Sequence, residues 1–367
     1  MPKLGKLQLD APFFQAGLAG YSDTAMRLVA RRHGCPYCVT EALLDVFLNQ
    51  GGRGLKAAEL HPDDHPIAGQ LMGSHPADIA AGAKVLLGMG YDVIDVNLAC
   101  PVKKIKKKSR GGHLMSVPDE AVAILDAVKQ AVGDQAPCTV KLRRGSNDSA
   151  EALDNFHAIF QAVIDLGYAG AVVHGRSVEQ KYLGPSNWNF LRSLTDQYGD
   201  IENFTIGGSG DIWQPSDIFR MINETGVKWV SVARGCIGNP WVFRQGALLV
   251  GDQEAAETPP TIFEQRDVLL EHFELSVAQH GEQLASRLMR KFGIRFSRHH
   301  PQGDDVKQAF IAVMGLPHWL PCWIRTTPRT ARASAATMPC RRRPPRPGVK
   351  RRWIVLFEYN RARPDSL

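Results

Sequence analysis

Eight short apolar segments recur along the first 233 residues, separated by stretches with helical periodicity. The segments are residues 12–16, 37–40, 67–71, 93–97, 139–142, 171–174, 204–207 and 229–233. Such alternation is typical of a parallel sheet covered by helices. Eight strand and helix pairs also match the size of about 250 residues that is usual for a closed eight-stranded barrel. We therefore predict an α/β fold, a (β/α)8 or TIM barrel. An open doubly wound sheet is the alternative, because periodicity alone does not show closure.

The barrel pattern predicts helices between the strands and ends near a Pro-Pro pair. Residues 76–89 and 118–132 are expected to be helices, opened by Ser74 and Ser116. Beyond Pro259 and Pro260 the segments 262–278 and 281–296 are amphipathic, with no strand candidate between them. We predict a barrel domain over residues 1–250 and an all-helical domain over residues 261–316.

The last segment, residues 317–367, differs in composition from the rest. It carries 12 Lys and Arg against 2 acidic residues, whereas residues 1–316 carry 32 against 35. The net charge of +7 of the whole chain therefore originates in this tail. A segment rich in Arg and Pro buries too little apolar surface to order itself, so we expect disorder. It is either a basic RNA-binding tail or the product of an altered reading frame.

The remaining global features place the protein in a broad class. At 367 residues with 44% hydrophobic content, the chain can bury a large core and a smaller one. There is no run of about 18 apolar residues and no signal-peptide pattern, so we expect a cytoplasmic protein that does not enter membranes. Seven irregularly spaced Cys agree with a reducing compartment. We expect a monomer.

The fourth apolar segment ends in a polar and reactive loop. Asn97 and Cys100 follow the strand, Pro101 ends the pairing, and Lys103 and Lys104 begin a lysine-rich stretch. In an alternating α/β chain, side chains at this edge of the sheet meet ligands. A buried structural Cys is the commonest fate of a thiol, but the neighbouring Asn and Lys favour a functional one.

Other strand ends carry polar side chains that should converge on the same edge. Gln70, Lys141, His174 and Arg176 all fall there. Lys141 lies within an apolar strand, where a cation is costly to bury without an anionic or electron-rich partner. It could form a Schiff base or pair with a cofactor.

Two glycine-rich turns follow the seventh and eighth strands, at residues 207–211 and 234–239. In such barrels these loops frequently bind phosphate through backbone N–H groups, and Arg234 adds a positive charge. Two other motifs are weaker. Cys35 and Cys38 have dithiol spacing but precede a strand, so we interpret them as structural. We expect no metal site.

Taken together, the motifs resemble the tRNA-dihydrouridine synthase family over roughly residues 11–316. The matching segments are residues 17–23 with Arg27, 69–73, 95–104, 140–141, 174–176 with Gln180, Tyr182 and Trp188, 210–212, 233–235 and 238–241. The loop around Cys100 is the most diagnostic of them. Glycine turns alone would fit many flavin barrels.

The resemblance implies an oxidoreductase that reduces uridines in tRNA to 5,6-dihydrouridine. In that family FMN, reduced by NADPH, delivers a hydride to the uracil, and a cysteine donates a proton. The resemblance gives this role to Cys100. It implies that the flavin site is lined by Gly17, Leu18, Ala19, Gln70, Lys141, His174, Ser209, Gly210, Asp211, Ala233 and Arg234. Candidates for contact with tRNA are Asn97, Lys103, Lys104, Arg176, Arg287, Arg290 and Lys291, although helical spacing alone favours a solvated face for the last three.

Two residues depart from the family pattern, and two other functions stay open. Gly17 stands where the family usually has Pro, and Ser209 where it usually has Asn; neither change removes a backbone N–H donor. One alternative is another FMN barrel that acts on a free pyrimidine or small enone. The other is a non-catalytic RNA-binding protein on the same fold, against which the presence of both Cys100 and Lys141 counts.

Overall fold

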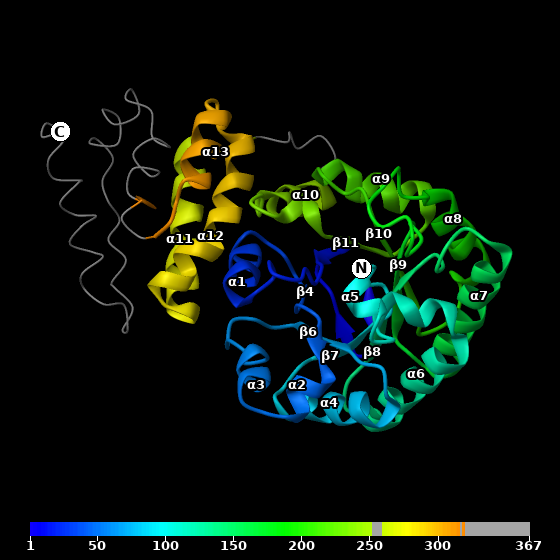
Figure 1. Cartoon of the computed structure of the whole chain (residues 1–367). Helices are drawn as coiled ribbons and strands as arrows, with labels where there is room; N and C mark the ends of the chain where they lie inside the picture. Colours follow the sequence, from blue (N-terminus) through cyan, green and yellow to red (C-terminus); the bar gives the residue numbers. More distant parts are fainter. Residues whose placement is uncertain (252–258, 316–317, 320–367) are drawn as a thin grey trace, which may run out of the picture. The chain divides into compact units, whose positions relative to one another are not determined.

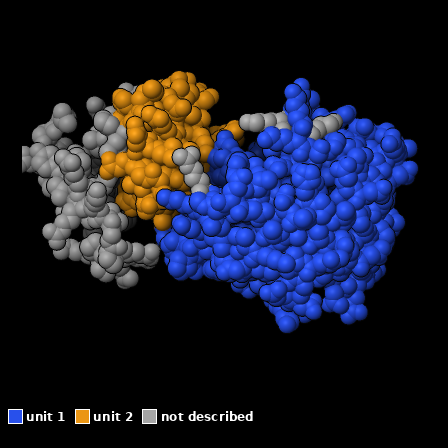
Figure 2. All heavy atoms as spheres, turned by 60° about the horizontal axis from the view of Figure 1, so that its bottom comes forward, with its two compact units in different colours: residues 1–260 blue, residues 261–367 orange. Residues whose placement is uncertain are grey.

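A computed structural model describes residues 1–251, 259–315 and 318–319. The chain divides into two compact units, residues 1–260 and 261–367 (Figure 2). The predicted disorder of the tail concerns residues that, apart from His318 and Trp319, lie outside the described ones.

The first unit contains strands at all eight predicted positions and three further short ones. The strands are β1 (Lys3–Leu4), β2 (Leu7–Gln8), β3 (Phe13–Gln15), β4 (Cys38–Val39), β5 (Leu43–Leu44), β6 (Ile67–Met72), β7 (Val93–Asn97), β8 (Cys138–Arg143), β9 (Gly170–His174), β10 (Thr205–Ser209) and β11 (Trp229–Val232). The apolar segments form strands because nearly all their residues are buried.

Parallel pairing closes these strands into a barrel. Their order in the sheet is β4-β3-β11-β10-β9-β8-β7-β6-β5, and β4 also pairs with β6. The pairings β3 with β4, β4 with β6 and β11 with β3 are parallel and complete the ring. The predicted eight-stranded barrel is therefore confirmed. The short β5 continues along β6 beyond the point where β4 leaves it.

Helices surround the ring of strands (Figure 1). They are α1 (Thr24–Arg32), α2 (Asp45–Asn49), α3 (Arg53–Ala57), α4 (Pro76–Gly88), α5 (Lys103–Lys106), α6 (Pro118–Val132), α7 (Ala150–Asp165), α8 (Trp188–Tyr198), α9 (Pro215–Thr225) and α10 (Trp241–Gly251), with 3-10 turns η1 (Gly111–Ser116) and η2 (Arg234–Cys236).

Two predicted helix caps are wrong. His75 and Val117, rather than Ser74 and Ser116, precede α4 and α6, and neither makes a side-chain capping bond. Both helices begin with Pro, which has no N–H to satisfy and a backbone already suited to the first turn. Ser116 donates instead to the carbonyl oxygen of His113.

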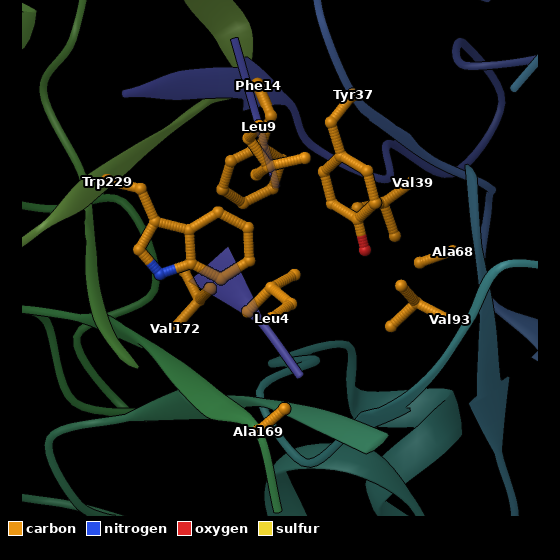
Figure 3. Close-up of a cluster of buried hydrophobic side chains, with 10 residues drawn as sticks. All are labelled: Leu4, Leu9, Phe14, Tyr37, Val39, Ala68, Val93, Ala169, Val172 and Trp229. Atoms are coloured by element: carbon orange, nitrogen blue, oxygen red, sulfur yellow. The ribbon is translucent and has the colours of Figure 1, made fainter. Parts of the chain in front are cut away.

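The amino-terminal end of the barrel is filled by a hydrophobic cluster (Figure 3). Its members are Leu4, Leu9, Phe14, Tyr37, Val39, Ala68, Val93, Ala169, Val172 and Trp229. The ring centroids of Phe14 and Trp229 lie 4.5 Å apart. The β1–β2 hairpin contributes Leu4, and Thr205 at the start of β10 donates to the carbonyl oxygen of Lys3 at 2.7 Å. The hairpin is thus held across the bottom of the barrel.

The second unit is helical in its described part. It contains α11 (Ile262–His280), α12 (Glu282–Phe296), the 3-10 turn η3 (Ser297–His299) and α13 (Gly303–Ile311). Trp319 is buried, with its ring centroid 4.7 Å from that of Phe273 and 5.4 Å from that of Phe310. The core of this unit therefore includes a residue beyond the expected boundary at 316. Across the described residues of the chain, no helix is both long and apolar enough to cross a membrane.

Candidate active site

Strand register brings the predicted polar residues together at the carboxyl end of the barrel. Gln70 on β6 is the register partner of Asp95 on β7, and Asn97 is the partner of Lys141 on β8. His174, the last residue of β9, is paired with Ser209, the last of β10. Because all these strands are parallel, the side chains share one edge.

A hydrogen-bonded chain connects three neighbouring strands inside the barrel. Asp95 accepts from Thr139 Oγ1 at 2.6 Å and from Gln70 Nε2 at 2.8 Å, and Gln70 Oε1 accepts from Asn97 Nδ2 at 2.6 Å. Asp95 is buried, and burial raises its pKa against the opposing effects of Thr139, Gln70 and Lys141. The carboxylate accepts only, so it orients the Gln70 amide, and that amide in turn orients Asn97.

Asn97 holds the backbone of the loop that carries Cys100. Its Oδ1 accepts from the N–H groups of Ala99 and Cys100 at 3.0 and 3.1 Å. Arg143 Nε donates to the Ala99 carbonyl at 2.9 Å, and the N–H of Gly112 donates to the Cys100 carbonyl at 3.0 Å. The thiol therefore occupies a fixed position beyond the end of β7.

The Cys100 thiol is half-buried, and its environment favours the protonated form. Burial raises its pKa above the ordinary value, and the N–H of Val102 and the charge of Arg143 oppose this. A thiol that keeps its proton near neutral pH is suited to act as an acid.

Lys141 on β8 has a half-buried side chain, and its surroundings penalise the charged form of the amine. Burial, with a contribution from Arg143, lowers its pKa from 10.5 to about 7, and Asp95 opposes the change. Among the described residues, its Nζ makes a single long hydrogen bond of 3.5 Å, to the carbonyl oxygen of Leu142. An anionic ligand beside Nζ would restore the charge.

His174 is neutral in this setting. Its Nδ1 accepts from the N–H of Arg176 at 3.1 Å, which places the ring proton on Nε2. Burial lowers its pKa well below the ordinary value, and the positive charges of Lys141 and Arg143 add to this effect. The ring therefore presents an N–H donor without a charge.

Asp211 organises the glycine-rich turn after β10. Its carboxylate accepts from Arg176 Nη2 at 2.7 and 2.8 Å and from the N–H of Ser186 at 2.7 Å. Gly210 has φ +115°, and a Cβ there would lie 2.4 Å from Ser186 Oγ, so the turn requires glycine. Arg176 is buried, so its guanidinium is part of this turn rather than displayed to solvent.

Arg234 lies at the start of η2 between two aromatic rings. Its guanidinium carbon is 4.9 Å from the ring centroid of Tyr182 and 4.8 Å from that of Trp213. Its Nη2 is 3.8 Å from Asp211 Oδ1. Ala233 precedes it, and a Cβ on Gly235 would lie 2.3 Å from the Ile212 carbonyl oxygen. A cation and glycine backbone at the ends of β10 and β11 are suited to a phosphate.

The segment after β3 completes the circle of strand ends. A Cβ on Gly17 would lie 2.2 Å from the carbonyl oxygen of Thr40 and 3.3 Å from Gln70 Oε1, so the backbone here is adapted to glycine. The Leu18 N–H donates to Ser22 Oγ at 2.7 Å. Ala19 is exposed.

Apart from Arg176, which is buried against Asp211, the predicted tRNA-contacting cations lie in two places. Lys103 is exposed on α5, which also contains Lys104. The other three belong to α12 of the second unit. There Arg287 is exposed, Arg290 Nη1 donates to the Val313 carbonyl at 3.4 Å, and Lys291 Nζ is 5.2 Å from the Phe292 ring centroid.

The structure adds site residues that the prediction omitted. Asp95 carried a usable signal, because an acid within an apolar strand is as costly as Lys141. Thr139 and Ser186 had no such signal.

Cys35 and Cys38 are buried, with sulfur atoms 3.9 Å apart. No group of three or more His, Cys, Asp or Glu among the described residues is arranged to hold a metal ion.

The sequence of this chain is similar to those of known tRNA-dihydrouridine synthases. A Rickettsia conorii protein named "Probable tRNA-dihydrouridine synthase" is 30% identical over 313 residues, covering 84% of this chain and 91% of that protein. The tRNA-dihydrouridine synthase B of Xanthomonas axonopodis pv. citri is 29% identical over 310 residues, covering 83% and 89%.

Two solved structures share the fold. They are histamine dehydrogenase from Rhizobium sp. 4-9 and a 2-naphthoyl-CoA reductase complex, each with a TM-score of 0.53 and 13% identity. They cover 74% and 72% of this chain, which spans about half the length of each, 50% and 55%. The family model described as "Dihydrouridine synthase (Dus)" matches residues 14–316. The chain therefore belongs to the dihydrouridine synthase family of flavin-dependent oxidoreductases.

Proposed function

We propose that this protein reduces uridines in tRNA to 5,6-dihydrouridine, with FMN bound at the carboxyl end of the barrel and NADPH as the reductant. The reaction class follows from the family. The tRNA substrate is supported by the names of the relatives, and the cofactor by the charges and turns at the strand ends.

The residues present fit an anionic flavin. Lys141 is a half-buried amine whose charge an anion would restore, and Arg234 directly precedes Gly235 at the end of β11, where backbone N–H groups can receive a phosphate. When bound, FMN supplies the hydride chemistry between NADPH and the uracil ring. We assign the flavin site to Gly17, Leu18, Ala19, Gln70, Lys141, His174, Ser209, Gly210, Asp211, Ala233 and Arg234. Asp211 contributes to the flavin site indirectly, because its carboxylate binds Arg176 and fixes the turn at Gly210.

Cys100 donates the proton in this proposal. The observation that carries the assignment is that Asn97 fixes its backbone while burial keeps its thiol protonated. The hydride reaches one carbon of the uracil double bond, and negative charge develops as the neighbouring carbon awaits a proton. A positioned acid with its proton in place neutralises that charge.

The RNA is held by positive charge in this proposal. Lys103 and Lys104 lie three and four residues after Cys100, so phosphates bound there lie near the reacting base. Arg287, Arg290 and Lys291 of the helical unit are further candidates, and Asn97 is a candidate for the base itself. Arg176, another candidate, is buried and contributes through its ion pair with Asp211. We expect a cytoplasmic monomer.

Replacing Cys100 with Ala tests the proposal. Dihydrouridine formation in tRNA should fall by roughly 10² to 10⁴, whereas NADPH oxidation with oxygen as acceptor should persist. Cys138→Ala, which removes a buried thiol at the start of β8, is the matched control and should keep dihydrouridine formation. The assignment fails if Cys100→Ala forms dihydrouridine within a few-fold of the parent. Reduction of free uridine but not of tRNA would favour the small-molecule alternative.

A further inference from the structure

A buried ion pair lies next to the loop that carries Cys100. Arg110 Nη2 is 3.6 Å from Oδ1 of Asp45. Asp45 is 0% exposed and Arg110 8%. Asp45 is the first residue of α2, and Arg110 immediately precedes η1, so the pair connects segments 65 positions apart in the sequence.

The pair is an inefficient way to stabilise a fold. Asp45 Oδ2 and Arg110 Nε are buried and have no hydrogen-bond partner among the described residues. Burial raises the pKa of Asp45, although the N–H of Val46 and the charge of Arg110 oppose this. Buried pairs of this kind can often be replaced by apolar residues without loss of stability. Stability alone therefore does not account for the pair. Its role is better sought in the two segments that it connects.

The pair holds the far end of the Cys100 loop. The near end is fixed by Asn97 and Arg143. At the far end, the N–H of Gly112 donates to the Cys100 carbonyl, and a Cβ on Gly111 would lie 2.9 Å from Cys100 Cβ. Residues 111 and 112 thus pack directly on the cysteine, and any shift of Arg110 is passed to them.

The surroundings of Asp45 are shaped for the carboxylate. A Cβ on Gly73, just after β6, would lie 2.3 Å from Asp45 Oδ2. Glycine at this position lets the acid approach the end of β6. Asp45 is therefore held between the barrel wall and the loop, where it can fix one to the other.

We infer that Asp45 and Arg110 are positioning residues for Cys100. They do not touch the thiol; they keep the segment that packs on it in place, so that the proton is delivered from a constant position. The inference rests on the proposed function of Cys100. It implies that loss of the pair harms proton delivery and spares the reaction of the flavin with NADPH.

The test uses Arg110→Met, Asp45→Asn and the double variant in the full-length holoprotein. NADPH oxidation with oxygen as acceptor should stay near the parent rate, whereas kcat for dihydrouridine formation should fall about 10- to 100-fold with little change in KM. The double variant should be no worse than the single ones, because each already removes the interaction. Arg110→Lys keeps the charge and should recover much of the loss.

Alkylation of Cys100 by iodoacetamide, followed by mass spectrometry of its peptide, reports on the loop without any turnover. The rate should rise several-fold in Arg110→Met and Asp45→Asn. Arg31→Met is the matched control, because Arg31 also pairs with a buried acid. Its side chain is 10% exposed and its Nε lies 2.8 Å from Asp64, away from this loop, so the alkylation rate should not change.

Parent-like alkylation and parent-like kcat in Arg110→Met would overturn the inference. Should Arg110→Met fail to fold, Arg110→Lys and Asp45→Asn decide by the same two measurements. Failure of the proposed function gives a different result, because Cys100→Ala would then form dihydrouridine normally while the alkylation rates still show whether the pair holds the loop.

Discussion

An acidic and a basic side chain lie on neighbouring strands of the barrel, and hydrogen bonds compensate their burial to different degrees. Asp95 accepts two hydrogen bonds from protein side chains, so its burial is compensated by Thr139 and Gln70. Among the described residues, the hydrogen bond of Lys141 is a single long one, which compensates less for burial. Its environment therefore favours a neutral amine until an anion arrives.

The lowered pKa of Lys141 predicts a pH-dependent stability in the flavin-free protein. The folded state releases the proton near pH 7, whereas the unfolded chain keeps it up to about 10.5. Between these values the unfolded state binds more protons, so stability rises with pH and is lost as the pH falls through 7. In urea unfolding, Lys141→Met should be more stable than the parent below about pH 7, with the difference shrinking towards about pH 10. A difference independent of pH would contradict the assignment.

Single residues were predictable where their type conflicts with their surroundings. Lys141 in an apolar strand and Cys100 before a proline both stand out in the sequence. Asp45 and Arg110 do not, because their significance depends on a contact between segments 65 positions apart. The burial of Arg176 depends in the same way on Asp211, and one sequence does not show which cation will meet which anion.

At the scale of elements, buried strands were the most predictable feature. Each of the eight is an apolar segment between turn residues, and that composition suffices to locate it. Strands β1, β2 and β5 have two residues each and, unlike the equally short β4, lie outside the eight apolar segments, so they were missed. The caps of α4 and α6 were misplaced because proline at the first helical position makes a capping side chain dispensable.

The helix α5 and the turn after it make the most testable element. Lys103, Lys107 and Lys108 are exposed there. Changing Lys103 and Lys107 to Glu should weaken tRNA binding and reduce the salt dependence of log K by roughly 0.7 to 0.9 for each phosphate that the protein no longer neutralises. The flavin spectrum should stay unchanged. Lys84→Glu on α4, also an exposed lysine, is the control. Equal effects of both changes on tRNA binding would show that only the overall charge matters.

At the scale of the whole molecule, the two units differ in how far composition predicted them. The barrel repeats one pattern eight times. The helical unit, in contrast, includes Trp319, which belongs to a segment whose Arg and Pro content led to a prediction of disorder. That residue is 1% exposed between Phe273 and Phe310. The sequence around Trp319 has no helical or strand periodicity, so only the folded core shows the role of this side chain.

Two deletions should therefore separate the tail from the core. Removal of residues 320–367 should leave both the flavin spectrum and the unfolding temperature unchanged, since the prediction from composition is that this segment supports no core. Removal of residues 317–367 also deletes Trp319 and should lower stability by about 3 to 5 kcal/mol, as for truncation of a buried aromatic residue. Thermal unfolding measures both. Equal unfolding temperatures would mean that Trp319 contributes nothing.

The β1–β2 hairpin has a consequence for the order of events in time. With the amino end of the barrel filled by Leu4, Phe14 and Trp229, the strand ends are approached from one side alone. On the proposed function, the nicotinamide and the target base both need that approach. A shared approach favours alternation, in which the reductant departs before the RNA arrives and the protein holds the electrons in the interval.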